Sequence, residues 1–190
     1  MKKFFAVFTV LLCLLTATTA LAASRNSPMS QQRDISVSSS RTLEKLYAQK
    51  KDARELLSLS YGYATISNAG GKSFTGESNS GHGIAYDYNG KKIFLTIRHG
   101  NYQRAEKINY ELVFVFYSKK NWENFIANQT KFFTKETSVI MDNGNLSRYG
   151  KLLWQTNPKV VADGVYAFKV DKGSYDIFTL LNDVKIYKMK

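Results

Sequence analysis

The chain contains a single cysteine, Cys13, in 190 residues. It lies inside an apolar run near the N-terminus, where we interpret it as an apolar filler and not as a lipid-attachment site. If that run is removed on export, the remaining protein has no disulfide and no cysteine-based metal site, although it enters an oxidising compartment. Its stability must then come from a buried core, and a chain of this length can bury one.

Histidine is almost as scarce, and the common catalytic motifs are absent. The two histidines, His82 and His99, do not have the spacing of a metal site. The "GGKS" at residues 70–73 does not complete a P-loop, and "GESNS" at residues 76–80 lacks the second glycine of a nucleophile elbow. We therefore expect no catalytic residue, no metal and no cofactor. A hydrolase that uses either histidine stays open as a weaker alternative, because a catalytic triad assembles only in space.

Residues 1–22 have the pattern of a secretory signal peptide. Lys2 and Lys3 precede an apolar run from Phe4 to Leu15, and Ala20-Leu21-Ala22 supplies the small residues that signal peptidase accepts. The run is too short to span a bilayer. We expect cleavage after Ala22 and an exported protein, located in the periplasm or peripheral to the envelope membrane.

This first prediction can be tested on the exported protein. Mass spectrometry should find an N-terminus near Ala23 and no acyl chain, because the only cysteine leaves with the signal peptide. An exported, soluble form that keeps Met1 would contradict it.

The rest of the chain divides into a linker and one domain. Residues 23–40 are polar and serine-rich, and a segment of this composition buries too little apolar surface to offset its ordering entropy, so we expect a flexible linker. Residues 41–60 place leucines at steps of three and four, which predicts an amphipathic helix that ends before Gly62. A single folded domain is expected over residues 41–190.

After Gly62 the apolar period changes to two, which predicts strands. Residues 84–97 around Asn89-Gly90 predict a β-hairpin. A second helix is expected at 119–133, irregular chain at 148–158 and a turn at 142–145. Further strands are expected at 63–67, 109–117, 137–141 and 184–187, and a second hairpin at 165–170 and 175–181. Tight turns between neighbours indicate an antiparallel sheet. The predicted fold class is α+β: a strongly twisted, barrel-like antiparallel β-sheet with two main helices.

Two sets of residues are expected to shape this sheet. Glycines within it let strands turn sharply or approach a partner closely: Gly70, Gly71, Gly76, Gly81 and Gly83. Much of the core should consist of Leu46, Ile66, Ile84, Phe94, Leu112, Phe114, Phe116, Trp122, Phe125 and Phe178.

The chain carries a formal net charge of +12, spread without a dense basic block. Such an excess suits solubility, and it also suits anionic lipid head groups, glycans or nucleic acid, of which export disfavours nucleic acid. The cations on the first helix and at the hairpin tip are the candidate contacts to anionic lipid, although they could equally serve only to solvate the helix face. They are Lys45, Lys50, Lys51, Arg54, Lys91 and Lys92.

Four segments together resemble the SYLF-type lipid-binding domain, in its bacterial exported branch. They are "TLEKLYAQKKDARELLSLSYGYATISNAGG" (42–71), "GHGIAYDYNGKKIFLT" (81–96), "YELVFVFYSKKNWENFI" (110–126) and "DGVYAFKVDKGSYDIFTLLNDVKIYK" (163–188). The ordered set carries the resemblance, which spans nearly all of residues 41–190. It implies a lipid- or membrane-surface-binding module that is not an enzyme and needs no cofactor. The competing interpretation is an envelope scaffold that binds a protein partner and no lipid.

Overall fold

The computed structural model describes residues 27–69, 80–99, 109–128 and 148–189. The chain divides into two units, Met1–Asp34 and Ile35–Lys190, and helix α2 (Pro28–Gln49) begins in the first and continues in the second. In the first unit the amide of Ser30 donates to the hydroxyl oxygen of Ser27 at 3.2 Å, directly before Pro28. Serine at the cap and proline at the first helical position are a strong helix start. The predicted signal peptide lies outside the described residues.

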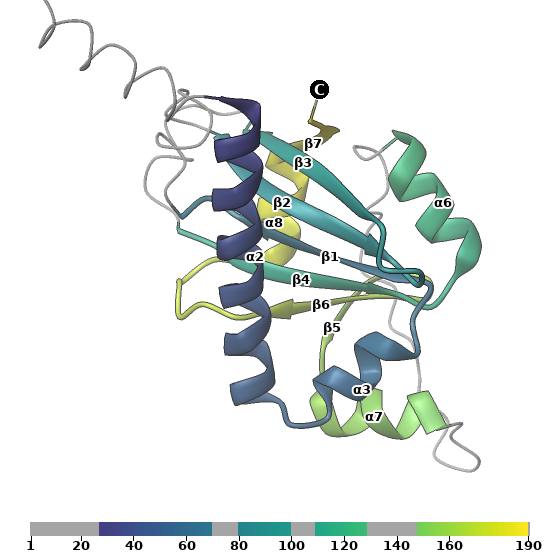
Figure 1. Cartoon of the computed structure of the whole chain (residues 1–190). Helices are drawn as coiled ribbons and strands as arrows, with labels where there is room; N and C mark the ends of the chain where they lie inside the picture. Colours follow the sequence, from purple (N-terminus) through teal and green to yellow (C-terminus); the bar gives the residue numbers. More distant parts are fainter. Residues whose placement is uncertain (1–26, 70–79, 100–108, 129–147, 190) are drawn as a thin grey trace, which may run out of the picture. The chain divides into compact units, whose positions relative to one another are not determined.

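In its described residues, the second unit is built on one seven-stranded antiparallel sheet (Figure 1). The strand order is β5-β6-β4-β1-β2-β3-β7. The strands are β1 (Gly62–Ser67), β2 (Ser80–Asp87), β3 (Lys92–His99), β4 (Glu111–Phe116), β5 (Lys159–Ala162), β6 (Val165–Lys169) and β7 (Val184–Lys188). The sheet curls into a half-barrel, so the α+β class and the strongly curled antiparallel sheet are confirmed.

Alternation along the strands gives the sheet two buried faces. On one face, Ile66 and Phe114 belong to a core cluster with Phe125 of α6 (Lys119–Asn128) and Leu180 of α8 (Ile177–Asp183). On the other, Val113 and its neighbours join Leu46 of α2 and residues of α3 (Ala53–Ser58) and α7 (Arg148–Thr156). Burying both faces explains why β4 reads as continuously apolar.

The serine-rich stretch is helical, which corrects the prediction of a flexible linker from residue 28 onward. Ser39 is buried against the sheet, where its hydroxyl lies 2.7 Å from that of Thr65 and 2.8 Å from that of Tyr86. Ile35 and Thr42 are buried on the same helix. The small serine side chain therefore lets α2 approach the sheet closely and bond to its polar groups, which composition alone does not reveal.

Three other local predictions were wrong. The helix predicted at 41–60 is broken after Gln49, and the break lets Leu56 and Leu57 of α3 bury in the same cluster as Leu46. Residues 148–156, expected to be irregular, form α7. The second hairpin is absent: β6 pairs with β4 and β5, and residues 177–183 form α8, whose cap Asp176 accepts a hydrogen bond from the amide of Thr179 at 2.8 Å.

Most of the predicted core is confirmed. Eight of the ten expected residues are buried, while Phe94 and Phe178 are half-buried and pack against the core clusters. The close approach expected at Gly81 and Gly83 is confirmed. A Cβ added at Gly81 would lie 2.8 Å from the backbone carbonyl oxygen of Ser67, and one added at Gly83 would lie 2.1 Å from that of Thr65. The predictions for 70–76, 129–133 and 137–145 fall on residues outside the described ranges.

Candidate functional site

The six predicted cations do not gather on one surface. Lys45 forms an ion pair with Glu111, with 2.7 Å between its ammonium nitrogen and each carboxylate oxygen. Glu111 pairs with Ser67 at one end of β1, whereas the β2–β3 hairpin tip lies at the other end, where Gly62 pairs with Asp87. Lys45 is thus neutralised by a local carboxylate and separated from the hairpin lysines by the length of β1.

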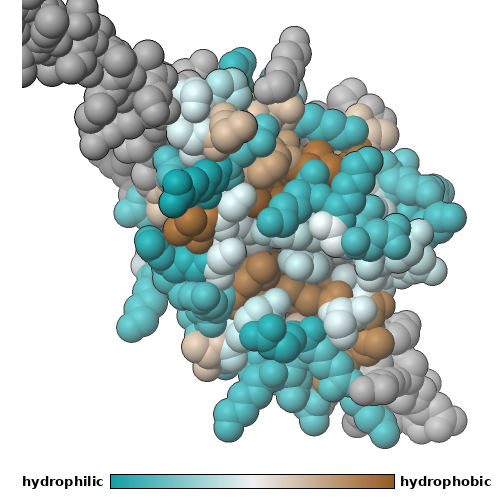
Figure 2. All heavy atoms as spheres, in the orientation of Figure 1, coloured by the Kyte–Doolittle hydropathy of each residue, from teal (hydrophilic) through white to brown (hydrophobic). Residues whose placement is uncertain are grey.

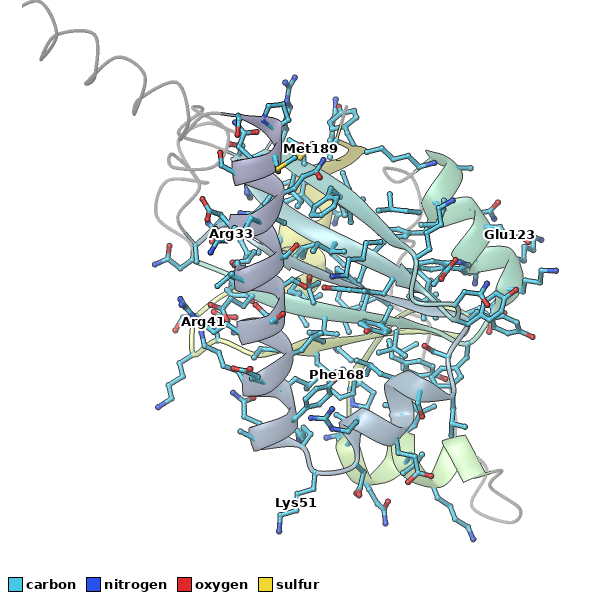
Figure 3. The ribbon with its side chains drawn as sticks, viewed as in Figure 1. Arg33, Arg41, Lys51, Glu123, Phe168 and Met189 are labelled. Atoms are coloured by element: carbon cyan, nitrogen blue, oxygen red, sulfur yellow. The ribbon has the colours of Figure 1, made fainter. Side chains whose placement is uncertain are left out.

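The cations around the break between α2 and α3 are placed differently again. The guanidinium carbon of Arg54 lies 4.2 Å from the centre of the Tyr47 ring, so this cation is held over an aromatic face. Lys51 is exposed and Lys50 is half-buried. Figure 3 places Lys51 beyond the end of α2 and Glu123 on α6, at different edges of the second unit.

Lys91 and Lys92 are exposed at the hairpin tip, as expected from the Asn-Gly turn. One carboxylate oxygen of Asp87 accepts hydrogen bonds from the amides of Asn89, at 2.9 Å, and Lys91, at 2.7 Å. Gly90 has a φ of +78°, which glycine adopts at little cost. These bonds fix the tip and leave Tyr88 75% exposed.

A groove of about 650 Å³ opens beside this tip. Three elements line it: residues 59–61 after α3, residues 87 and 88 at the start of the turn, and residues 119, 122 and 123 of α6. Leu59 and Tyr61 are 43% and 44% exposed there. We call these three segments together, with Lys91, Lys92 and Lys120, the hairpin end. Figure 2 shows a largely hydrophilic surface on the face in view, with separate hydrophobic areas.

Gly62 determines how Trp122 lines the groove. A Cβ at this position would lie 2.7 Å from three atoms of the Trp122 indole, so the ring lies directly against the glycine. Phe116 contacts the indole edge-on, with 5.3 Å between ring centres. Helix α6 begins next to Ser118, whose hydroxyl accepts from the Asn121 amide at 3.3 Å. The indole is therefore held between strand and helix, and only 8% of the residue remains exposed.

His82 lies on β2 beneath α2, away from the groove-lining segments. Its Nε2 is 3.0 Å from the hydroxyl of Ser38, and the residue is 1% exposed. Burial lowers the pKa of His82 to about 4, so the imidazole is neutral near pH 7. Its neighbours give it a structural role in the contact between α2 and the sheet.

His99 lies on the opposite face of the sheet, between a tyrosine and a carboxylate. Its Nε2 is 3.2 Å from the Tyr110 hydroxyl, and its Nδ1 is 3.5 Å from a carboxylate oxygen of Asp183 at the end of α8. Burial lowers the pKa of His99, while Asp183 acts in the opposite direction. Burial also raises the pKa of Tyr110. The serine contact, Ser38, is made by His82, and the carboxylate contact, Asp183, is made by His99. A hydrolase triad needs both at one histidine, so these contacts do not favour the hydrolase alternative.

The described ranges hold no group of three His, Cys, Asp or Glu side chains placed to bind a metal ion. None of the helices in the part of the chain that the structure describes has the length and hydropathy needed to span a bilayer. The fold and groove define an α+β domain with a curled antiparallel sheet and an aromatic-lined surface groove. No protein-family model matches the chain, and no curated protein matches it.

The sequence correctly predicts that Lys91 and Lys92 lie at an exposed hairpin tip, but it does not predict the groove. Its lining residues come from three segments separated by about 25 to 60 positions, so no local motif contains them. One local signal was present: Tyr88 stands directly before Asn89-Gly90. In the structure the Gly90 amide donates to the Asp87 carbonyl oxygen at 2.9 Å, so Tyr88 and Asn89 form the middle of the turn, where side chains project into solvent.

Proposed function

We propose that residues 35–190 form a non-enzymatic, exported module that binds an anionic lipid or membrane surface through the hairpin end, without a cofactor. The supporting observation is that exposed Leu59, Tyr61 and Tyr88 lie around one groove, beside the exposed lysines of the hairpin tip and the start of α6. The resemblance to lipid-binding SYLF domains points to the same class of function.

The chemistry of the hairpin end suits an interface between water and lipid. Tyrosine has an apolar ring and a polar tip, and it concentrates where one end of a side chain is apolar and the other is wet. Lysine near an anionic membrane surface contributes about 1 kcal/mol each. Lys91, Lys92, Lys119 and Lys120 would supply this attraction, while the exposed apolar side chains enter the head-group region.

A second candidate is a scaffold that binds an envelope protein, since exposed apolar side chains also suit a protein partner. Ionic strength separates the two, because attraction between exposed charges and anionic lipid falls steeply with salt.

Flotation with liposomes tests the proposal with two variants of equal charge loss. The first changes Lys91, Lys92, Lys119 and Lys120 to glutamine, and the second changes Lys45, Lys50, Lys51 and Arg54. On phosphatidylglycerol vesicles at low salt, the first variant should partition at least about thirtyfold more weakly, the equivalent of losing two lysine contacts of about 1 kcal/mol each. The second should lose less, because Lys45 lies 2.7 Å from Glu111 and Arg54 lies 4.2 Å from the centre of the Tyr47 ring. The contacts in the first set are looser: Lys119 is 3.8 Å from Glu123, and Lys92 is 6.0 Å from the centre of the Tyr86 ring.

The reverse ranking would assign the contact to the helix cations. If the unmodified protein does not float at any salt concentration, lipid binding fails and the scaffold is favoured. Circular dichroism of both variants serves as the folding control.

A further inference from the structure

The groove at the hairpin end has a local charge unlike that of the protein. Asp87 and Glu123 line it with one lysine, Lys119, although the chain as a whole carries +12. The Lys119 ammonium lies 3.8 Å from a Glu123 carboxylate oxygen, and both side chains are more than 60% exposed. The groove therefore offers two carboxylates among aromatic rings, which disfavours a bare anion inside it.

Its aromatic lining is the second feature. Tyr61, Tyr88 and Trp122 line the same groove, and the Trp122 ring is held in place against Gly62. Aromatic faces attract cations, and several of them around one site are the usual way in which proteins hold a substituted ammonium group. A volume of about 650 Å³ is within the range of small-molecule sites.

We propose that this groove binds the ammonium group of a zwitterionic phospholipid head group, with the exposed rings of Tyr61 and Tyr88 beside the cation and Asp87 and Glu123 as its counter-charges. The nearly buried Trp122 lines the groove and reports on its occupancy. The phosphate of the same head group lies outward, toward Lys91 and Lys119. This proposal rests on the proposed membrane function and adds a specific head-group site to it. The surrounding lysines provide attraction to anionic lipid, and the groove selects membranes that also contain a zwitterionic phospholipid.

Soluble head groups test the site without a membrane. Phosphocholine, phosphoethanolamine and glycerol phosphate are titrated into the protein, with calorimetry and the indole N–H resonances as readouts. Trp154→Phe assigns the Trp122 resonance, since the chain has two tryptophans. At least one of the two ammonium compounds should bind and shift the Trp122 resonance, and glycerol phosphate should not. Equal binding of glycerol phosphate, or binding of neither ammonium compound, overturns the proposal.

Variants at Tyr88 separate cation binding from simple apolar contact. Tyr88 is exposed, so its replacement leaves the core intact. Tyr88→Leu should weaken binding of the ammonium compound about fivefold, whereas Tyr88→Phe keeps the aromatic face and should bind almost as well as the unmodified protein. Tyr187→Ala is the matched control, because Tyr187 is 41% exposed on β7 and does not line the groove. Equal losses in the leucine and phenylalanine variants would overturn the cation-binding role.

Vesicles then distinguish failure of this site from failure of membrane binding. Two vesicle types contain the same fraction of phosphatidylglycerol. In the first type the remaining lipid carries the ammonium head group that bound, phosphatidylethanolamine or phosphatidylcholine. In the second type the remaining lipid is a neutral galactolipid. The protein should float with both and more strongly with the first, and Tyr88→Leu should remove only that difference. Equal flotation overturns the head-group site and leaves the proposed function standing. If the protein floats with neither vesicle type, the proposed membrane function is overturned. If a lysine-containing peptide binds the groove more tightly than either soluble head group does, the groove is assigned to a protein partner instead.

Discussion

A Gly83→Ala substitution should lower the free energy of unfolding by about 3 kcal/mol or more, the upper end of what overpacking costs. A Cβ at Gly83 would lie 2.1 Å from the backbone carbonyl oxygen of Thr65 and 3.1 Å from its carbonyl carbon. These atoms belong to β1, which pairs with β2 along its whole length, from Gly62 with Asp87 to Ser67 with His82. No flexible side chain can move aside, so the two central strands must separate locally. The methyl group is small, but the atoms it meets are fixed on both sides by the sheet.

Urea denaturation followed by circular dichroism measures this effect. Gly90→Ala is the matched control, because an added Cβ there meets nothing within 4 Å and only the φ of +78° opposes alanine, at about 1 to 2 kcal/mol. A poor yield of folded Gly83→Ala beside a normal yield of Gly90→Ala would agree with the prediction. Equal stability of the two variants would show that β1 and β2 do not approach as closely as described.

The parts of the fold that sequence reasoning found are those fixed by neighbouring residues. The hairpin of β2 and β3 follows from alternating apolar residues around Asn89-Gly90, where Gly90 has a φ of +78° that glycine adopts most readily. Strand β4 follows from its continuous apolar run. In both cases the information lies within about ten residues of the element.

What sequence reasoning missed depends on distant contacts. The serines of α2 predicted a flexible linker because their composition is polar, yet Ser39 is buried by bonding to Thr65 and Tyr86 on two different strands. The apolar residues of α8 suit a strand or a helix over so short a length, and only the cap at Asp176 favours the helix that forms. The candidate site was missed in part for the same reason: Trp122 can line the groove only because Gly62, sixty positions earlier, has no side chain.

Lowering the pH from 7 to 4 should destabilise the protein, with His82 alone contributing about 3 kcal/mol. Burial lowers the pKa of His82 from an ordinary value of 6.5 to about 4 in the folded state. Between these two values the unfolded chain binds a proton at this histidine and the folded protein does not, so the free energy of unfolding rises with pH. The contribution is complete above about pH 6.5 and is lost as the pH falls to about 4. A difference of about 2.5 pH units corresponds to about 3 kcal/mol.

Other groups titrate in the same range, so the measurement is a difference between variants. Urea denaturation of the unmodified protein and of His82→Gln is compared at pH 7, 5.5 and 4, because glutamine does not titrate and can still hydrogen-bond to Ser38. The unmodified protein should lose about 3 kcal/mol more than His82→Gln over this range. His99→Gln is the matched control and should keep most of the original pH dependence, since Asp183 opposes the effect of burial at His99. If His82→Gln follows the unmodified protein at every pH, the neutral histidine beneath α2 is not what makes the fold sensitive to acid.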